Sequence, residues 1–171
     1  MRLPLQRQLA AASGAFFDER RRYRYLLWRS YDAALPAVTF LMLNPSAADE
    51  HYNDPTITRV ISLAKGWGFG RLYVVNLFAF MTADPGQLKR RRDPVGLDND
   101  RWIDFALEQS QTVVLAWGNH GVHKERAAAV LSRLPRERCR VIAVTAQGQP
   151  RHPLYTPKNS SLLEAPVEWW A

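Results

Sequence analysis

The fold is decided by residues 38–56, which read VTFLMLNPSAADEHYNDPT. They begin with an apolar run, residues 38–43, that has the length of a fully buried strand. Pro45 ends this strand, because proline cannot donate to a sheet ladder and holds the residue before it in an extended conformation. Asp54 and Pro55 then open a helix, since aspartate is a good N-cap and proline suits the first helical position. One strand therefore delivers a polar loop to the start of a helix, where open α/β sheets bind ligands.

The composition is that of a single globular domain over residues 1–171. Apolar residues make up 47% and aromatic residues 11% of the chain, which is long enough to bury a sizeable core. The only cysteine, Cys139, excludes an internal disulfide and favours a reducing compartment, so we expect a cytoplasmic protein. The sequence shows neither a signal-peptide pattern nor an apolar run of transmembrane length, so we expect no membrane partner. Residues 1–20 are expected to form a lead-in and residues 156–171 a C-terminal tail.

Buried apolar runs alternate with segments of helical spacing. They predict strands at 38–43, 72–76, 113–117 and 141–145, and helices at 55–66, 99–109 and 124–134. This alternation predicts an α/β fold, here a three-layer α/β/α sandwich with a central, mostly parallel sheet. Residues 22–28 alternate tyrosine or leucine with arginine, which predicts an edge strand with one exposed face. Residues 82–98 are predicted to form a long, basic loop.

The charge of the chain points to a phosphate-bearing partner. The formal net charge is +7, and arginine is concentrated in residues 20–22 and 90–92. Clustered arginine suits contact with nucleic acid or a nucleotide. Within the long loop, the predicted phosphate-binding residues are Arg90, Arg91 and Arg92. The alternative is a solvated surface whose charge only aids solubility.

Polar or small residues stand at the carboxyl end of each predicted buried strand. In a parallel sheet these ends converge on one rim, where ligands bind. Asparagine carries both a donor and an acceptor, so it can read an amide-like edge of a ligand. We therefore expect one cleft that is lined by Asn44, Ser46, Asn76, Trp117, Asn119, Arg151 and His152.

Several of these side chains also have a structural interpretation. Asn44 and Asn76 can serve the backbone of turns, as asparagine often does. His152 can be a structural residue of a polar loop. Phe78 and Phe80 are candidates for stacking on a ligand, although phenylalanine is more often a core residue.

A metal site is a further alternative. Asp49, His51 and Asp54 lie close together in the sequence, but they match no known ligand spacing, and Asp54 is explained as a helix cap. We expect neither a metal nor a cofactor. A metal-assisted hydrolase that uses these three residues stays open as an alternative.

Five motifs together resemble a bacterial and phage family of domains of unknown function. They read LNPSAAD, DPT, VVNLFAF, AWGNHG and QPRHPLY, and the resemblance covers about residues 22–155. The order of the motifs is also similar to that of the uracil-DNA glycosylase superfamily. Those enzymes have a first loop of Gly-x-Asn-Pro or Gly-x-Asp-Pro type, a strand ending in asparagine, an apolar strand ending near glycine, and a late His-Pro-Ser loop.

In this second resemblance, residues 43–45 correspond to the first loop and Asn76 to the base-reading asparagine. Residues 113–118 correspond to the third strand and residues 152–153 to the last loop. The first loop lacks the family's glycine, and the last motif reads His-Pro-Leu-Tyr without the serine. The resemblance implies an uracil-DNA-glycosylase-like fold and hydrolysis of the N-glycosidic bond of a base in DNA or a nucleotide.

The glycosylase resemblance implies roles for the rim residues. Asn44 would position the attacking water, Asn76 would bind the base edge, and His152 would donate to a base oxygen as charge develops. Phe78 or Phe80 would stack on an extruded base. The arginines at 90–92 would hold backbone phosphates. The alternative is a nucleic-acid or nucleotide binding module on the same fold, without catalysis.

Overall fold

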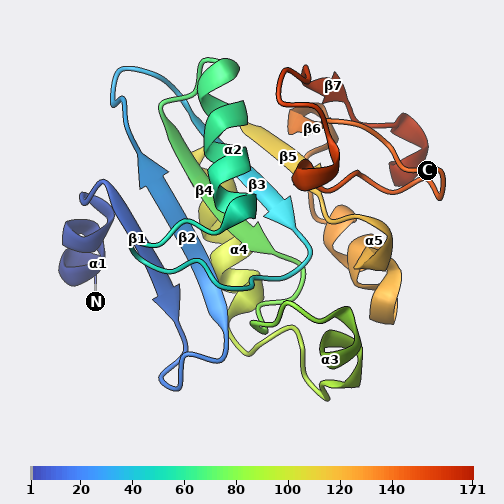
Figure 1. Cartoon of the computed structure of the whole chain (residues 1–171), viewed down its shortest axis with the longest axis horizontal. Coiled ribbons are helices and arrows are strands. Elements are labelled where there is room, and N and C mark those ends of the chain that lie inside the picture. The colour runs from blue at the N-terminus through green and yellow to red at the C-terminus, as the bar shows by residue number, and fades with distance from the viewer. Residues whose placement is uncertain (1) are drawn as a thin grey trace.

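Seven strands form one sheet within residues 2–171, which the computed structural model describes (Figure 1). The strands lie in the order β1-β2-β4-β3-β5-β6-β7. Their bounds are β1 Ser13–Phe17, β2 Arg24–Ser30, β3 Ala37–Met42, β4 Arg71–Asn76, β5 Thr112–Ala116, β6 Cys139–Val141 and β7 Leu163–Glu164.

The four predicted buried runs are neighbours in the sheet and run parallel to one another. β3 pairs with both β4 and β5, and β5 pairs with β6, all in parallel. The sheet as a whole is nevertheless mixed, because β1 with β2, β2 with β4, and β6 with β7 pair antiparallel. The prediction of an α/β fold is therefore confirmed, whereas the prediction of a mostly parallel sheet is wrong.

β2 lies inside the sheet, between β1 and β4, so the prediction of an edge strand at 22–28 is wrong. Its arginines do not face solvent: Arg24 is 2% and Arg29 is 6% exposed. The Arg24 Nη1 donates to the carbonyl oxygen of Ala48 at 3.1 Å, and the Arg29 Nη2 donates to that of Asp49 at 2.7 Å. Both of these arginines therefore contact the loop after β3. β1, which lies within the expected lead-in, forms the edge instead.

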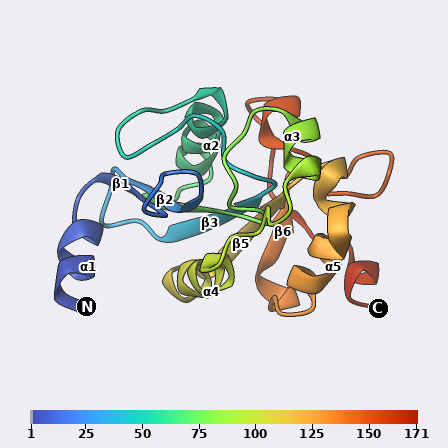
Figure 2. The same cartoon turned by 90° about the horizontal axis from the view of Figure 1, so that it is seen from below.

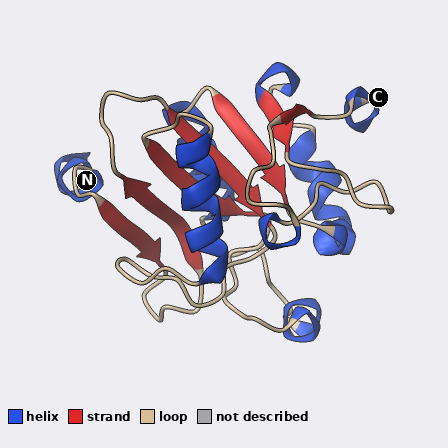
Figure 3. Ribbon diagram, turned by 45° about the horizontal axis from the view of Figure 1, so that its top comes forward, coloured by secondary structure: helices blue, strands red, loops and turns tan. Residues whose placement is uncertain are grey.

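Helices cover both faces of the sheet. α2, Pro55–Gly66, lies across one face, and α4, Asn99–Gln109, lies on the other (Figures 2 and 3). α2 buries Ile57 and Val60 in a core with Phe40 from β3. α4 buries Ile103 in a second core with Leu115 from β5. The predicted helices at 55–66 and 99–109 are confirmed.

The predicted helix at 124–134 is shorter than expected. A 3₁₀ segment, η1 Asn119–Glu125, comes first, and α5 extends only over Arg126–Leu131. Lys124 and Glu125 have φ angles of 53° and 54°, in the left-handed region that side chains rarely adopt. A right-handed helix cannot pass through two such residues, so α5 begins after them.

The remaining elements are short. The predicted strand at 141–145 ends at Val141, because the chain then turns back so that the Thr145 N–H donates to the carbonyl oxygen of Gln149. The loop at 82–98 contains a helix whose first turn is capped by Asp84. No helix in the described part of the chain is both long and apolar enough to cross a membrane. The other helical pieces are α1 Arg2–Leu9, α3 Pro85–Arg90, η2 Arg136–Arg138, η3 Pro153–Tyr155 and η4 Val167–Trp170.

Candidate functional site

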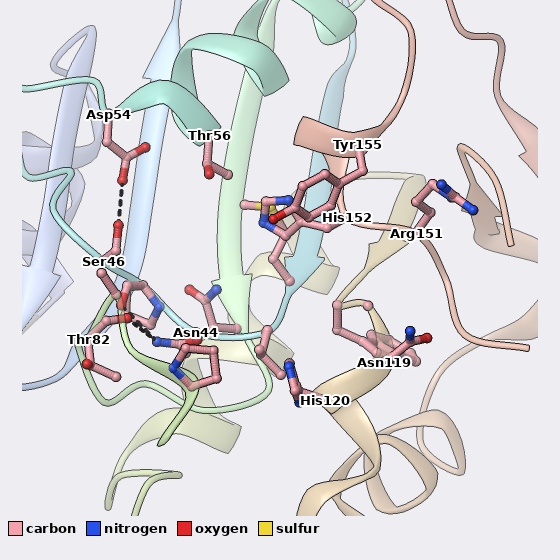
Figure 4. A pocket seen from close by; sticks show the side chains of 18 of the residues that line it. Asn44, Ser46, Asp54, Thr56, Thr82, Asn119, His120, Arg151, His152 and Tyr155 are labelled. Atoms are coloured by element: carbon pink, nitrogen blue, oxygen red, sulfur yellow. Dashed lines mark hydrogen bonds between the residues drawn. The ribbon is translucent and has the colours of Figure 1, made fainter. Parts of the chain in front are cut away.

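A cavity of about 620 Å³ lies where β3, β4 and β5 end, beside the N-terminus of α2. Figure 4 shows Asn44 and Ser46 on one side of it and His152 and Tyr155 on another. The structure brings the rim residues predicted from the sequence into its wall, although they come from four separate segments of the chain. These residues are Asn44, Ser46, Asn76, Trp117, Asn119, Arg151 and His152.

The other predicted residues lie elsewhere. Phe78 is fully buried in a core and is not in the cavity wall, so the expectation that it stacks on a ligand is not met. Phe80 packs against Tyr23, with 5.8 Å between the ring centroids. Neither ring is in the cavity wall.

The arginines at 90–92 also lie outside the cavity wall. Arg90 is 3.7 Å from the Asp84 carboxylate, and both side chains are largely exposed. The Arg91 guanidinium lies 4.8 Å from the Phe80 ring centroid, and its Nε donates to the Tyr23 hydroxyl at 3.2 Å. Of these three arginines, only Arg92 is exposed without such a contact between its side chain and the described part of the chain. Two of the three arginine side chains therefore already contact other residues of the protein.

Asn76 is the most unusual residue in the wall. It ends β4 and is 2% exposed, yet neither its Oδ1 nor its Nδ2 has a hydrogen-bond partner in the described chain. Its backbone is held firmly, because Asn99 Nδ2 donates to the carbonyl oxygens of Asn76 at 2.9 Å and Leu77 at 3.1 Å. Native proteins satisfy nearly all buried polar groups, and the exceptions call for a functional explanation. A ligand with one donor and one acceptor would complete this amide.

The amide nitrogen of Asn44 is fully used in hydrogen bonds to the backbone. Its Nδ2 donates to the carbonyl oxygens of Thr82 at 2.8 Å, Pro45 at 3.1 Å and Phe80 at 3.4 Å. Carbonyl oxygens only accept, so these contacts orient the amide and leave Oδ1 on the opposite side. The nitrogen thus ties the loop after β3 to the loop after β4 (Figure 4), while the oxygen is available as an acceptor.

His152 has one ring nitrogen occupied. Its Nδ1 accepts a hydrogen bond from the Leu154 N–H at 3.3 Å, which caps η3. Burial lowers the pKa of His152, and the charge of Asp54 only partly opposes this. A neutral imidazole that accepts at Nδ1 carries its proton on Nε2. His152 therefore offers the cavity a neutral N–H donor.

The loop that carries His152 is fastened from two sides. Arg59 of α2 donates from Nη1 to the carbonyl oxygens of Pro153 and Thr156. The neighbouring loop is held by Trp117, whose Nε1 donates to Gln149 Oε1 at 3.1 Å, and by Asn119, whose Oδ1 accepts from the Thr145 hydroxyl at 2.6 Å. Figure 4 shows the Arg151 guanidinium directed away from His152. These contacts fix the wall opposite Asn44.

The pH dependence of stability tests the state of His152. Its pKa is lowered on folding, so the unfolded chain binds this proton more readily, and the free energy of unfolding falls as the pH drops through about 6.5. His152→Asn should remove the contribution of this imidazole to the pH dependence of the free energy of unfolding. The loop should stay intact, because the asparagine oxygen can still accept a hydrogen bond from the Leu154 N–H. Urea unfolding at about pH 7.5 and about pH 5 measures the difference. If the free energy of unfolding fell equally with pH in wild type and variant, the assignment of a neutral His152 would be contradicted. His51→Asn, at an exposed position, serves as the control.

Asp54 is the only carboxylate that the described chain contributes to the cavity wall. Its Oδ1 accepts from the Ile57 N–H at 2.9 Å, and its Oδ2 accepts from the Ser46 hydroxyl at 3.1 Å and the Ala48 N–H at 3.2 Å. A further, longer contact comes from the Ala47 N–H at 3.4 Å. The carboxylate therefore folds the loop after β3 onto the first turn of α2.

The alternative of a metal site is not supported by this geometry. Asp49 accepts from the N–H groups of His51 and Tyr52 in an exposed turn, and Asp54 is occupied as described. Among residues 2–171, no three histidine, cysteine, aspartate or glutamate side chains are placed to hold a metal ion. Asp49, His51 and Asp54 are therefore turn and cap residues.

Arg24 is a wall residue that the sequence did not predict. The alternation at 22–28 put it on an exposed face, and no local pattern distinguishes it from Arg22, which is exposed. Burial lowers its pKa to about 10, so it is a cation at neutral pH. Only knowledge that the loop after β3 covers β2 would have indicated a buried positive charge here.

Comparison with known proteins confirms the resemblance to a family of domains of unknown function and does not show the resemblance to uracil-DNA glycosylases. No curated protein and no solved structure matches the chain. Residues 24–154 match a family described as a protein of unknown function, DUF1643, and this span includes every cavity residue named above except Tyr155. The chain therefore belongs to the DUF1643 family of proteins of unknown function.

Proposed function

We propose that the protein hydrolyses the N-glycosidic bond of a base in DNA or a nucleotide, in the cytoplasm, with the base held in the cavity. The observation that carries this proposal is the unpaired, buried amide of Asn76 in the cavity wall. A nucleobase edge presents adjacent donors and acceptors, which is the pattern that an asparagine amide complements. α2 and α4 on opposite faces of the sheet are compatible with a three-layer, uracil-DNA-glycosylase-like fold.

Hydrolysis of the N-glycosidic bond in the proposed mechanism needs no covalent bond between the protein and the substrate. As the glycosidic bond breaks, the sugar gains oxocarbenium character and the base leaves with negative charge. His152 would donate its Nε2–H to the departing base, where a fixed neutral donor stabilises developing charge without reorganisation. Asn44 Oδ1 would accept a hydrogen bond from the attacking water, and Asn76 would hold the base edge. Water attacks the sugar carbon, its proton passes to solvent, and the base takes the bonding electron pair.

One observation favours a second candidate, a binding module without catalysis. Asp54, the only carboxylate that the described chain places in the wall, accepts hydrogen bonds from several donors and is not free as a general base. A site that only binds a ligand would need Asn76 and the cavity, but it would need no general base. The two candidates therefore differ in product formation and not in ligand.

Release of free base from nucleotides and from modified or mismatched oligonucleotides tests the proposal. His152→Asn should lower kcat by roughly 10²-fold to 10³-fold, as loss of one preorganised donor does, with KM little changed. His51→Asn is the matched control, because this exposed histidine lies outside the cavity wall and should leave turnover unchanged. A chelator should have no effect. Ligand binding by the wild type without any base release would refute hydrolysis and leave the binding module.

A further inference from the structure

Arg24 is a buried cation whose hydrogen bonds are incomplete. It stands at the start of β2, beside the end of β4, and is 2% exposed. Its Nη1 donates to the carbonyl oxygen of Ala48 at 3.1 Å, and its Nε has no partner in the described part of the chain. A buried charge is costly unless it is paired and hydrogen-bonded. The wall of the cavity therefore contains a guanidinium group whose hydrogen-bonding capacity is not fully used by the described chain.

The charges around Arg24 leave room for an anion. Asp54 is the acidic group whose charge acts on Arg24, and its oxygens already accept from Ile57, Ser46 and Ala48. The N-terminus of α2 also contributes positive potential at this end of the cavity, where Thr56 and Ile57 are in the wall. In the wall, one carboxylate that is already hydrogen-bonded thus faces Arg24 and a helix N-terminus.

We propose that the cavity binds a small nucleotide whose terminal phosphate lies against Arg24, with the base at Asn76. This inference rests on the proposed function and narrows its substrate to a free nucleotide. Arg24 and Asn76 stand on neighbouring strands, so one ligand can reach both. A guanidinium matches a phosphate because its N–H groups form paired, charge-assisted hydrogen bonds with phosphate oxygens.

The burial of Arg24 favours a terminal phosphate over one within a strand. A phosphate inside a polynucleotide carries chain on both sides, so a strand would have to pass through the cavity to reach this side chain. A terminal phosphate enters with its own sugar and base alone. The outer arginines agree with this choice, because Arg90, Arg91 and Arg92 lie outside the cavity wall and do not continue a phosphate track from Arg24.

Calorimetric titration of the full chain with the common nucleoside monophosphates and their nucleosides tests the inference. For at least one base, the wild type should bind the monophosphate roughly 10-fold to 100-fold more tightly than the nucleoside. Arg24→Met should reduce that ratio to about one, and Arg24→Lys, which keeps the charge but not the planar fork, should retain part of it. Arg29→Met is the matched control. It removes another buried arginine of β2 that holds the same loop but is not in the cavity wall, so the ratio should persist.

The outcomes separate this inference from the proposed function. Equal affinity for nucleoside and monophosphate in the wild type would overturn the phosphate subsite, and so would equal loss of the ratio in the Arg24 and Arg29 variants. Base release from oligonucleotides without binding of any monophosphate would overturn the free-nucleotide substrate and leave hydrolysis standing. Phosphate preference lost with Arg24 alone, without base release, would support the subsite and refute hydrolysis.

Discussion

Asn76→Leu is expected to make the unliganded protein more stable and to weaken ligand binding strongly. The amide is buried without a partner in the described chain, so folding returns it no hydrogen bond from the protein. An apolar side chain of similar size avoids this loss, and the free energy of unfolding should rise by about 1–2 kcal/mol. A ligand that used both amide atoms would then have two unpaired groups in a dry site. Each costs about 1–3 kcal/mol, which corresponds to roughly a 30-fold to 10⁴-fold loss of affinity.

Asn99→Leu is the control for this result. Asn99 is also an asparagine that is fully buried, but its Nδ2 donates to two carbonyl oxygens and it is not in the cavity wall. Its replacement should lower the free energy of unfolding by about 1–3 kcal/mol, because the Asn76 carbonyl loses the Asn99 donor, whereas the Leu77 carbonyl keeps the one from Arg126 Nε. Urea unfolding of the three proteins gives both values. If Asn76→Leu destabilised the protein as much as Asn99→Leu, Asn76 would be a structural residue and the base site would lose its main support.

Asp54→Ala is expected to cause the largest loss of stability. The substitution removes the N-cap of α2 and leaves the buried N–H of Ala48 without its acceptor. Together these should lower the free energy of unfolding by about 2–4 kcal/mol. For a chain of this length that corresponds to a fall in Tm of roughly 4–16 °C. Thermal and urea unfolding measure the loss.

Asp49→Ala separates the role of position 54 from the general effect of removing an aspartate from the same loop. The Asp49 carboxylate accepts from two N–H groups in an exposed turn, where water can replace it. Its loss should cost less than about 1 kcal/mol. Similar losses at both positions would mean that Asp54 does not organise the rim.

The strands and the residues at their ends could be predicted because the signals are local. Residues 38–43 form an apolar run that is followed by Asn44 and Pro45, and the chain leaves β3 at Met42. The carboxyl ends of parallel strands meet at one rim, which predicts that Asn44, Asn76 and His152 lie together. The parallel pairings of β3 with β4, of β3 with β5 and of β5 with β6 are present. The order of residues 54–56 likewise fixed the start of α2.

Features that depend on distant segments could not be predicted in this way. Arg24 is buried only because the loop containing Ala48 covers it. β1 is a strand because it pairs with β2, and its five residues are too few to show a clear period. The end of β6 at Val141 depends on how the following chain turns back. Arg91 reads as free charge in the sequence, and its packing on Phe80 appears only in three dimensions.

Three side chains at the rim hold the surrounding loops by hydrogen bonds, and this has a thermodynamic consequence. Asn44 binds the loop after β4, Asp54 binds the loop after β3, and Arg59 binds the loop of His152, with partners up to 97 residues apart in the chain. These loops lose their conformational freedom when the protein folds and have little left to lose on association. A small molecule entering the cavity should therefore meet a preorganised wall, and hydrogen exchange of the rim amides should change little between the free and the bound protein.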